Sequence, residues 1–234
     1  MKRHSLGQHY LTDQSVVARI VSLAAIRGGE NVLEIGTGEG ALTRELARVA
    51  SSLEGYEIDE GNLQTTREAL GELKARLHLG DAFEKRPRFD VLVASLPYSR
   101  SSSFVEWISG QRYDRAVVVL QEDFVRKVTS PPGARDYRAV SVIAQASSEV
   151  RELGRMQRSS FSPQPRVNSV IAGWRPLRKL SPQQIAAVKK LFSLRRRQVS
   201  AAIAHLGGEV PEGLASLRVG ALTPDQALAL AASI

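Results

Sequence analysis

The stretch that decides the fold is Leu33-Glu34-Ile35-Gly36-Thr37-Gly38-Glu39-Gly40, in which an apolar run leads into three alternating glycines. The run Asn31–Ile35 predicts a strand, and the helical spacing of apolar residues in Leu42–Val49 predicts a helix after the turn. Glycines in such a turn let the backbone approach a ligand closely. The pattern is not the G-x-G-x-x-G dinucleotide fingerprint. Alone, it fits a dinucleotide, a sulfonium nucleoside or a purely structural turn.

Outward from this turn, short apolar runs alternate with helical patterns, which is typical of an α/β protein. Thr12 and Asp13 look like cap residues before an amphipathic helix at Gln14–Ile26, and a further helix is predicted at Asn62–Leu73. The strands are expected to form a mostly parallel sheet. They are predicted at Asn31–Ile35, Ser52–Ile58, Ala75–Leu79, Phe89–Ser95, Arg115–Leu120 and Asn168–Trp174.

The last part of the chain has a different pattern, because from Ser181 onward it is helical only. Ser181-Pro182 and Thr223-Pro224 predict helix starts, with proline at the first helical position. The linker-like Arg175-Pro176-Leu177-Arg178 precedes this region. The sequence therefore predicts a main domain over residues 1–176 and a small helical domain over residues 177–234.

Positive charge is concentrated toward the C-terminus. The chain has a formal net charge of +8 and a pI near 10.1. Residues 1–150 hold 19 Lys plus Arg against 20 Asp plus Glu, a net of −1, while residues 151–234 hold 13 against 4, a net of +9. Cations gathered in this way release counterions from phosphates, so nucleic acid is the leading partner.

Further features of the composition narrow the class of protein. The chain contains no cysteine, which excludes disulfides and thiolate metal sites, and its four histidines are too scattered to suggest zinc. We therefore expect no metal. The N-terminus has no apolar signal-peptide core, and no window approaches the roughly 20 apolar residues of a membrane span. A cytoplasmic protein is expected.

Polar or glycine residues stand at the ends of four predicted strands. They are Gly36, Glu57, Asp81 and Ser95. Ligands of open α/β sheets bind outside the carboxyl ends of parallel strands, so a single ligand would reach all four residues. Glu57 ends the strand after the glycine turn and suits the hydroxyls of a ribose, whichever nucleoside is bound.

An ordered series of motifs across nearly the whole chain resembles a known family, the rRNA adenine N6-dimethyltransferases and the related erythromycin-resistance methyltransferases. The motifs are LGQHYL (Leu6–Leu11), LEIGTGEGALT (Leu33–Thr43), YEID (Tyr56–Asp59), GDA (Gly80–Ala82), SLPY (Ser95–Tyr98), VLQEDFVRKV (Val119–Val128), FSPQPRVNS (Phe161–Ser169) and LFSLRRR (Leu191–Arg197). The resemblance implies a Rossmann-like class I methyltransferase fold with a seven-stranded sheet. It also implies an S-adenosylmethionine-binding catalytic domain at 1–176 and an RNA-binding helical domain at 177–234.

The resemblance implies that S-adenosylmethionine lies across the strand ends. His9 and Leu11 would contact its methionine side, Glu57 would accept hydrogen bonds from both ribose hydroxyls, and Asp81 would accept one from the adenine amine. The implied cofactor-binding residues are His9, Leu11, Gly36, Gly38, Glu57, Ile58, Asp81, Ala82 and Ser95.

The resemblance also implies the site of chemistry, which comprises Ser95, Leu96, Pro97, Tyr98 and Phe161. An exocyclic base amine is a poor nucleophile because its lone pair is conjugated into the ring. The Pro97 carbonyl and the Ser95 side chain would accept its N–H groups and hold the nitrogen in line with the methyl group. Tyr98 would stack on the flipped base, with Phe161 as a second stacking face unless it is ordinary core. No general base is needed, because the proton leaves after the transfer.

Ser95 departs from the family pattern, which has asparagine at this position. Serine is shorter and has one oxygen, and it also resembles the S-P-P-Y pattern of cytosine-N4 methyltransferases. A cytosine target and single methylation therefore stay open. So do a small-molecule or protein-amine methyltransferase on the same fold and a non-catalytic assembly factor that keeps the cofactor pocket.

The expected target is a pair of adjacent adenines near the 3′ end of small-subunit rRNA, in a precursor particle, with a large-subunit adenine as the alternative. The protein is expected to be a monomer. Arg195, Arg196 and Arg197 are the expected RNA-binding residues, interpreted as three successive arginines on one helix about 100° apart, of which two would reach phosphates.

Overall fold

The apolar part of the deciding stretch lies in strand β2 (Asn31–Ile35), inside a seven-stranded sheet. The computed structural model describes residues 9–210 and 212–234, so Leu6, Gly7 and Gln8 of the first motif lie outside the described residues. The strand order is β4-β3-β2-β5-β6-β9-β7. Neighbouring strands from β4 to β6 are parallel, whereas β9 runs antiparallel to β6. The predicted mostly parallel sheet is confirmed.

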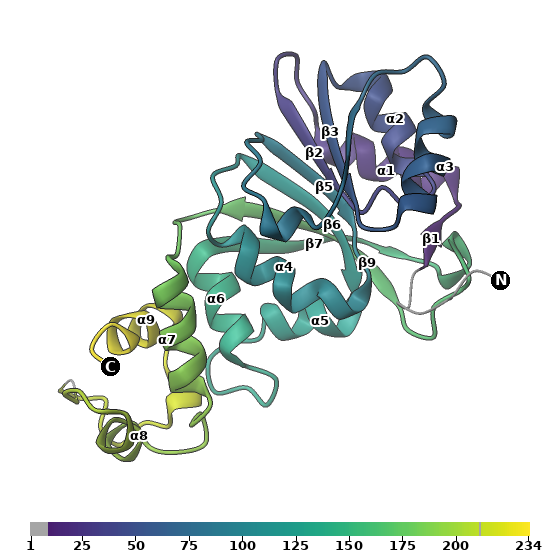
Figure 1. Ribbon diagram of the computed structural model, residues 1–234. Coiled ribbons are helices and arrows are strands. Elements are labelled where there is room, and N and C mark those ends of the chain that lie inside the picture. The colour runs from purple at the N-terminus through teal and green to yellow at the C-terminus, as the bar shows by residue number, and fades with distance from the viewer. Residues whose placement is uncertain (1–8, 211) are drawn as a thin grey trace. The chain divides into compact units, whose positions relative to one another are not determined.

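Each predicted strand is present, with bounds that differ from the prediction by at most two residues. Besides β2 they are β3 (Ser52–Glu57), β4 (Arg76–Leu79), β5 (Val91–Ser95), β6 (Arg115–Gln121) and β9 (Ser169–Pro176). In β5 and β6 almost every residue is buried, as expected for parallel strands that are covered on both faces. Figure 1 shows β2, β3, β5 and β6 running side by side.

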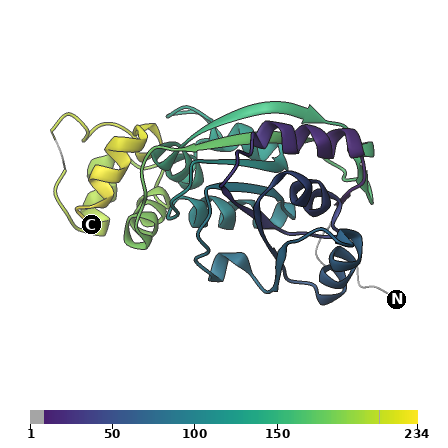
Figure 2. The same cartoon turned by 90° about the horizontal axis from the view of Figure 1, so that it is seen from above.

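Three helices accompany the first strands. They are α1 (Gln14–Ala24), α2 (Ala41–Val49) and α3 (Glu60–Leu70). Asp13 caps α1 as predicted, because its side chain accepts from the backbone N–H groups of Ser15 and Val16. Thr12 does not act as a cap, because its hydroxyl donates to the Ser160 carbonyl oxygen instead. In Figure 2, α1 lies along the strand β7 (Ser148–Met156), where the Arg19 guanidinium donates to the Leu153 carbonyl oxygen at 3.2 Å.

A second, two-stranded sheet joins the N-terminal segment to a distant part of the chain. Strand β1 (Tyr10–Leu11) pairs antiparallel with β8 (Phe161–Ser162), with Leu11 opposite Phe161. Both of these side chains are buried in the hydrophobic core beneath the sheet, together with residues of α1, β5 and β6. The pairing fixes the segment that begins at His9 beside the carboxyl ends of the strands.

The chain divides into two compact units. Unit 1 comprises Met1–Phe104, Arg112–Asp123 and Arg151–Arg175, and unit 2 comprises Val105–Gln111, Phe124–Val150 and Pro176–Ile234. Two internal segments therefore group with the C-terminal residues, which a single boundary at residue 176 does not describe. The division of the chain into functional domains at that residue stays a prediction.

Unit 2 is built from helices. Helices α4 (Ser101–Ile108) and α5 (Glu122–Val128) begin in unit 1 and end in unit 2, which also contains α6 (Ala139–Ser147), α7 (Pro182–Phe192), α8 (Val199–Leu206) and α9 (Pro224–Ala231). Helices α6, α7 and α9 pack on one another. Ser181 and Thr223 cap α7 and α9, with prolines in the first turn, so both predicted helix starts are confirmed.

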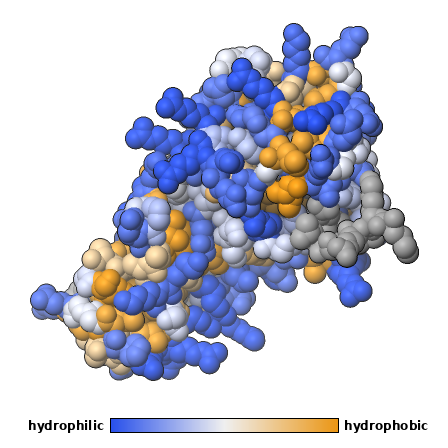
Figure 3. Space-filling model, viewed as in Figure 1, coloured by the Kyte–Doolittle hydropathy of each residue, from blue (hydrophilic) through white to orange (hydrophobic). Residues whose placement is uncertain are grey.

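The face shown in Figure 3 is largely hydrophilic, with apolar residues gathered in strips between the polar ones. Across residues 9–210 and 212–234, none of the helices combines the length and the apolar character needed to cross a membrane.

Candidate active site

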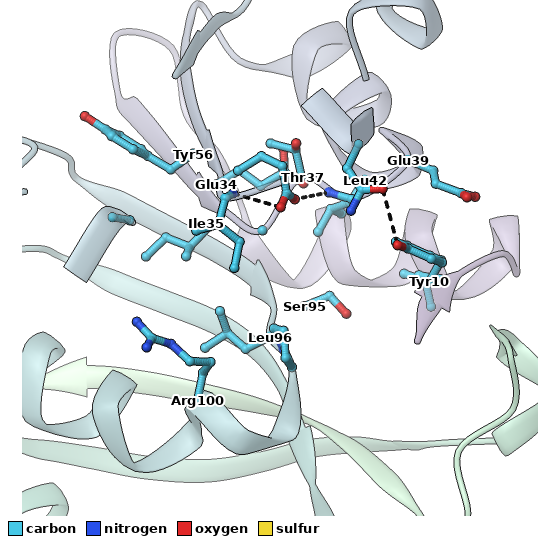
Figure 4. Close-up of a pocket in the computed structure, with 18 of the residues that line it drawn as sticks. Tyr10, Glu34, Ile35, Thr37, Glu39, Leu42, Tyr56, Ser95, Leu96 and Arg100 are labelled. Atoms are coloured by element: carbon cyan, nitrogen blue, oxygen red, sulfur yellow. Dashed lines mark hydrogen bonds between the residues drawn. The ribbon is translucent and has the colours of Figure 1, made fainter. Parts of the chain in front are cut away.

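A pocket lies at the carboxyl ends of β2, β3, β4 and β5 (Figure 4). Gly36, Glu57, Asp81 and Ser95 all line it, so the structure brings the predicted strand-end residues together. The remaining predicted cofactor-binding residues that line it are His9, Leu11, Gly38, Ile58 and Ala82. The pocket walls therefore come from four strand-end loops and from the β1 segment.

Glu57 connects two of these loops. One carboxylate oxygen accepts from the Gly38 N–H at 2.8 Å, and the other accepts from Ile58 at 2.8 Å and Asp59 at 3.0 Å. Burial raises the pKa of Glu57 above its usual value, while these three hydrogen bonds act in the opposite direction. Gly38 has a φ of +57°, and a Cβ there would lie 3.3 Å from the Tyr10 ring, so glycine suits this close approach. A carboxylate has about four acceptor positions, so Glu57 keeps capacity for ligand hydroxyls.

Asp81 forms an ion pair that the sequence does not predict. One of its oxygens accepts from the Phe83 N–H at 2.8 Å, and the other pairs with the guanidinium of Arg100. The Arg100 guanidinium also lies over the Phe83 ring, 4.8 Å from its centroid, in a cation–π contact. Arg100 follows the SLPY motif by two residues and lines the pocket. Nothing local in the sequence signals a contact between residues 81 and 100.

Glu34 is the second pocket residue that sequence reasoning does not single out, although it lies within the deciding stretch. It is fully buried, and neither carboxyl oxygen has a hydrogen-bond partner among the described residues. Burial, with a smaller contribution from the charge of Glu57, raises its pKa to about 8. An acidic residue inside an otherwise apolar strand is the signal that could have identified it. Figure 4 shows Glu34 beside Ile35 and Thr37 in the pocket wall.

The SLPY segment follows β5 directly. The Ser95 side chain makes no hydrogen bond within the described residues, so its hydroxyl is available to a ligand. The Pro97 carbonyl oxygen accepts from the Arg100 backbone N–H at 2.9 Å, which leaves one of its two lone pairs. The Tyr98 hydroxyl lies 2.6 Å from the Ser169 hydroxyl oxygen, and burial raises the pKa of Tyr98. Leu96 is buried and lines the pocket.

Two predicted residues, His9 and Phe161, make contacts that the sequence does not indicate. The His9 ring lies against Tyr98, with 5.5 Å between ring centroids, and its Nδ1 lies 2.7 Å from the Pro163 carbonyl oxygen. His9 therefore lines the pocket and also contacts Tyr98, which is not one of the residues that line it. Phe161 is 4% exposed and packs in the hydrophobic core, because β8 turns it inward while Ser162 faces out. The structure thus places Phe161 in the core and not in the pocket lining.

The sequence profile of one protein family, described as ribosomal RNA adenine dimethylase, matches residues 1–224. The chain belongs to this family. The match covers the strand-end pocket, the SLPY segment and most of the helical C-terminal region. The resemblance drawn from the ordered motifs is therefore confirmed, and so is the assignment to the rRNA methyltransferases.

Known relatives and solved structures are similar to this chain over most of its length. The ribosomal RNA small subunit methyltransferase A of Thermotoga neapolitana is 35% identical over 204 residues, which are 84% of this chain and 77% of that protein. The crystal structure of the 23S rRNA methyltransferase ErmE has a TM-score of 0.67 at 27% identity and covers 95% of this chain and 98% of its own. A dimethyladenosine transferase from Plasmodium falciparum has the same fold, with a TM-score of 0.79 at 24% identity and coverage of 95% and 96%.

The arginines at the end of the family's last motif do not lie on a helix, and this corrects the sequence interpretation. Helix α7 ends at Phe192, and residues Arg195–Arg197 form a turn before α8. The turn forms because the backbone N–H groups of Arg195 and Arg197 donate to carbonyls three residues earlier, and because the Arg195 carbonyl oxygen accepts from Gly220 at 2.9 Å. Arg196 and Arg197 are exposed, and Arg195 is half-buried.

Proposed function

We propose that this protein uses S-adenosylmethionine to dimethylate the exocyclic N6 of adjacent adenines near the 3′ end of small-subunit rRNA. The observation that carries the proposal is the continuity of the site. The strand-end pocket with its ribose-type carboxylate, Glu57, passes directly into the Ser95–Tyr98 segment in a chain of the adenine dimethylase family. The 35% identity to a protein named small subunit methyltransferase A supports the choice of RNA.

The pocket residues fit a cationic sulfonium nucleoside. Four carboxyl groups line the pocket, and one of them, Glu34, is buried without a hydrogen-bond partner among the described residues, so it would be stabilised as an anion by a nearby positive charge. When bound, S-adenosylmethionine supplies an electrophilic methyl group on its sulfonium. Glu57 would hold the ribose hydroxyls, and Asp81 would accept the adenine amine beside its bond to Arg100.

The residues of the SLPY segment would bind and orient the target adenine. The free lone pair of the Pro97 carbonyl and the unbonded Ser95 hydroxyl would accept the two N–H groups of the amine, which fixes the direction of the nitrogen lone pair. The Tyr98 ring, held by Ser169, would stack on the base. Because the nitrogen becomes cationic only on methylation, its proton then leaves to solvent without a dedicated base.

Two alternative targets are each favoured by one observation. The serine at position 95 offers a shorter acceptor than the family's asparagine, which suits a cytosine amine. The likeness to ErmE, a 23S rRNA methyltransferase, favours a large-subunit adenine.

For the RNA-binding surface we propose Arg195, Arg196 and Arg197, acting from a turn of unit 2 within the predicted domain at residues 177–234.

Methyl transfer to ribosomal RNA from a strain that lacks the endogenous enzyme tests this proposal. The purified protein is incubated with methyl-labelled S-adenosylmethionine and with small-subunit precursor particles or naked rRNA, and the modified nucleosides are mapped by mass spectrometry. Two adjacent dimethyladenosines near the small-subunit 3′ end are expected. Methylcytosine, or label only in large-subunit rRNA, would show that the proposed target is wrong. Cofactor binding without methyl transfer would indicate an assembly factor.

A further inference from the structure

A cleft at the end of β6 lies next to the proposed site of chemistry, and the proposed function assigns no ligand to it. Two cavities of about 330 and 420 Å³ share Glu122, Arg158 and Asn168 as lining residues. Ligand pockets begin at about 300 Å³, so the cleft has room for a nucleotide. We call it the β6-end cleft, and it also includes Arg155, Arg166 and Ser169.

The sheet register places this cleft one strand away from the SLPY segment. Ser95, the last residue of β5, pairs with Val119 of β6, and two residues further along β6 Gln121 pairs with Ser169 of β9. Adjacent strands are about 4.8 Å apart, so the cleft lies close to the SLPY segment. Ser169 also connects the two places directly, because its hydroxyl bonds the Tyr98 hydroxyl at 2.6 Å.

One wall of the cleft is a fixed polar edge. The Asn168 side-chain amide donates to one oxygen of Glu122 at 3.2 Å, and the Arg155 guanidinium pairs with the other oxygen at 3.2 Å. The backbones are also joined, because the Glu122 N–H donates to the Asn168 carbonyl oxygen at 3.0 Å. Asn168 keeps its amide oxygen and one N–H, which can read the edge of a base.

The lining of the cleft also carries positive charge that has no ion-pair partner among the described residues. Arg158 and Arg166 are exposed, and neither forms an ion pair within residues 9–210 and 212–234. The excess of arginine is local, because residues 151–175 contain five Arg and no Lys against one Glu and no Asp. Guanidinium groups that lack a protein carboxylate suit phosphate oxygens, which they bind in a bidentate manner.

We propose that the β6-end cleft binds the ribonucleotide that adjoins the target base in the RNA strand. Arg158 and Arg166 hold the phosphate of that nucleotide, and Asn168, fixed by Glu122, contacts its base. This inference rests on the proposed function, because it requires an RNA strand whose reacting base is at Tyr98. It adds a second subsite, which positions the strand by its backbone beside the reacting nucleotide.

The test combines protein variants with modified RNA. Arg158→Ala and Arg166→Ala are assayed on a short RNA that contains the target adenines, and on the same RNA with an uncharged methylphosphonate at the phosphate 5′ or 3′ to the target. Each variant is expected to raise KM about tenfold on unmodified RNA, the size of one charge-assisted contact, with little change in kcat. On the RNA that lacks the contacted charge, the same variants should have no further effect.

The matched control is Arg67→Ala on α3, an exposed arginine on a helix that packs on β3 and β4, away from the cleft. It removes the same charge and should leave KM unchanged, and the dissociation constant of S-adenosylmethionine should be unchanged in all three variants. Equal effects of Arg67→Ala, or losses that add fully to the methylphosphonate losses at both positions, would overturn the inference. If the wild-type protein binds and methylates no RNA, the proposed function itself fails, which is a different result.

Discussion

The carboxyl edge of the sheet has two halves of opposite charge. The pocket over β2 to β5 is lined by four acidic residues, with Arg100 bound to one of them, whereas the β6-end cleft carries arginines without carboxylate partners among the described residues. The acidic residues are Glu34, Glu39, Glu57 and Asp81, and the arginines are Arg158 and Arg166. The proposed cofactor is a cation and the proposed substrate is a polyanion. One edge of a sheet can therefore bind both. If the two halves act separately, a variant in one half should leave the ligand affinity of the other half unchanged.

The largest expected effect in the acidic half comes from Glu57→Ala. The variant loses two charge-assisted hydrogen bonds to the ribose, at about 1.5 kcal/mol or more each, so the dissociation constant of S-adenosylmethionine should rise roughly 100-fold or more. Titration calorimetry measures the cofactor affinity, and fluorescence anisotropy should show unchanged RNA affinity. A parallel loss of RNA affinity in a protein that unfolds at the wild-type temperature would contradict the separation of the two halves.

Glu34→Gln tests how much charge the acidic half carries at neutral pH. The folded protein retains the Glu34 proton up to pH about 8, because burial raises the pKa of this carboxyl, whereas the unfolded chain releases it near 4.5. Between these values the folded state binds more protons, so the free energy of unfolding should fall as pH rises from about 5 to 8, with a slope that approaches about 1.4 kcal/mol per unit. The glutamine variant lacks this decline. Urea unfolding of both proteins at pH 5, 6, 7 and 8 measures it, and parallel curves would contradict the assignment.

Replacement of Arg195, Arg196 and Arg197 by alanine tests the basic side in unit 2. If two of them contact phosphates, RNA affinity should fall about tenfold at low salt, and the slope of log affinity against log salt should decrease by roughly 1.4. Filter binding at several salt concentrations gives the slope, and cofactor affinity should not change. Unchanged salt slopes would remove this turn from the RNA-binding surface.

Arg100→Ala examines the one arginine or lysine among the described residues that line the acidic half. Loss of the guanidinium frees the Asp81 carboxylate from its fixed orientation, so the affinity for S-adenosylmethionine should fall about fivefold, within the range of one charged hydrogen bond. An analogue without the adenine amine should bind the variant and the wild type equally, because it makes no bond to Asp81. Arg100→Lys should restore part of the loss. Tighter cofactor binding by the alanine variant would show that Arg100 competes with adenine instead.

Ser95→Asn, at the border between the two halves, should have the smallest effect. The longer amide carbonyl reaches the adenine amine better than the hydroxyl, so the rate of adenine methylation should stay the same or rise about twofold, the size of a modest hydrogen-bond gain. Single-turnover methyl transfer measures the rate. Complete loss of cofactor binding would sink this prediction, because it would make Ser95 a structural part of the pocket.

The sequence predicts the strands from β2 to β6 and β9 but does not predict β1, β7 and β8. Strands β5 and β6 are built around continuous apolar runs, and β2 is apolar apart from Asn31 and Glu34, so their positions follow directly from the residues. Strand β7 is not predicted, because its nine residues are mostly polar and only those at its two ends are buried. Strands β1 and β8 have two residues each, which is too short for any periodicity to show. Their pairing depends on residues about 150 positions apart.

The residues of the site also divide into those that the sequence can predict and those that it cannot. Gly36, Glu57, Asp81 and Ser95 are predictable because each follows a recognisable strand, and the parallel sheet brings strand ends together. The Arg100 contact is not predictable, since it depends on the side-chain conformations of two loops. The interpretation of Arg195–Arg197 as helical is wrong because α7 ends at Phe192. Turn hydrogen bonds and the bond from the Gly220 N–H to the Arg195 carbonyl oxygen hold the arginines outside the helix, and the sequence gives no signal for that distant bond.

The three backbone bonds of Glu57 have a consequence for genetics. A substitution there releases the Gly38 loop and the Ile58–Asp59 loop together, so a mutant phenotype would mix loss of the cofactor with loss of local structure. Asp81 is the better position for a separation-of-function allele, because its carboxylate holds only its own turn and Arg100. Cells that carry Asp81→Ala would keep a folded protein that still binds RNA. A defect that is seen in cells without the protein but not in these cells would therefore be caused by the absence of the protein and not by the absence of methylation.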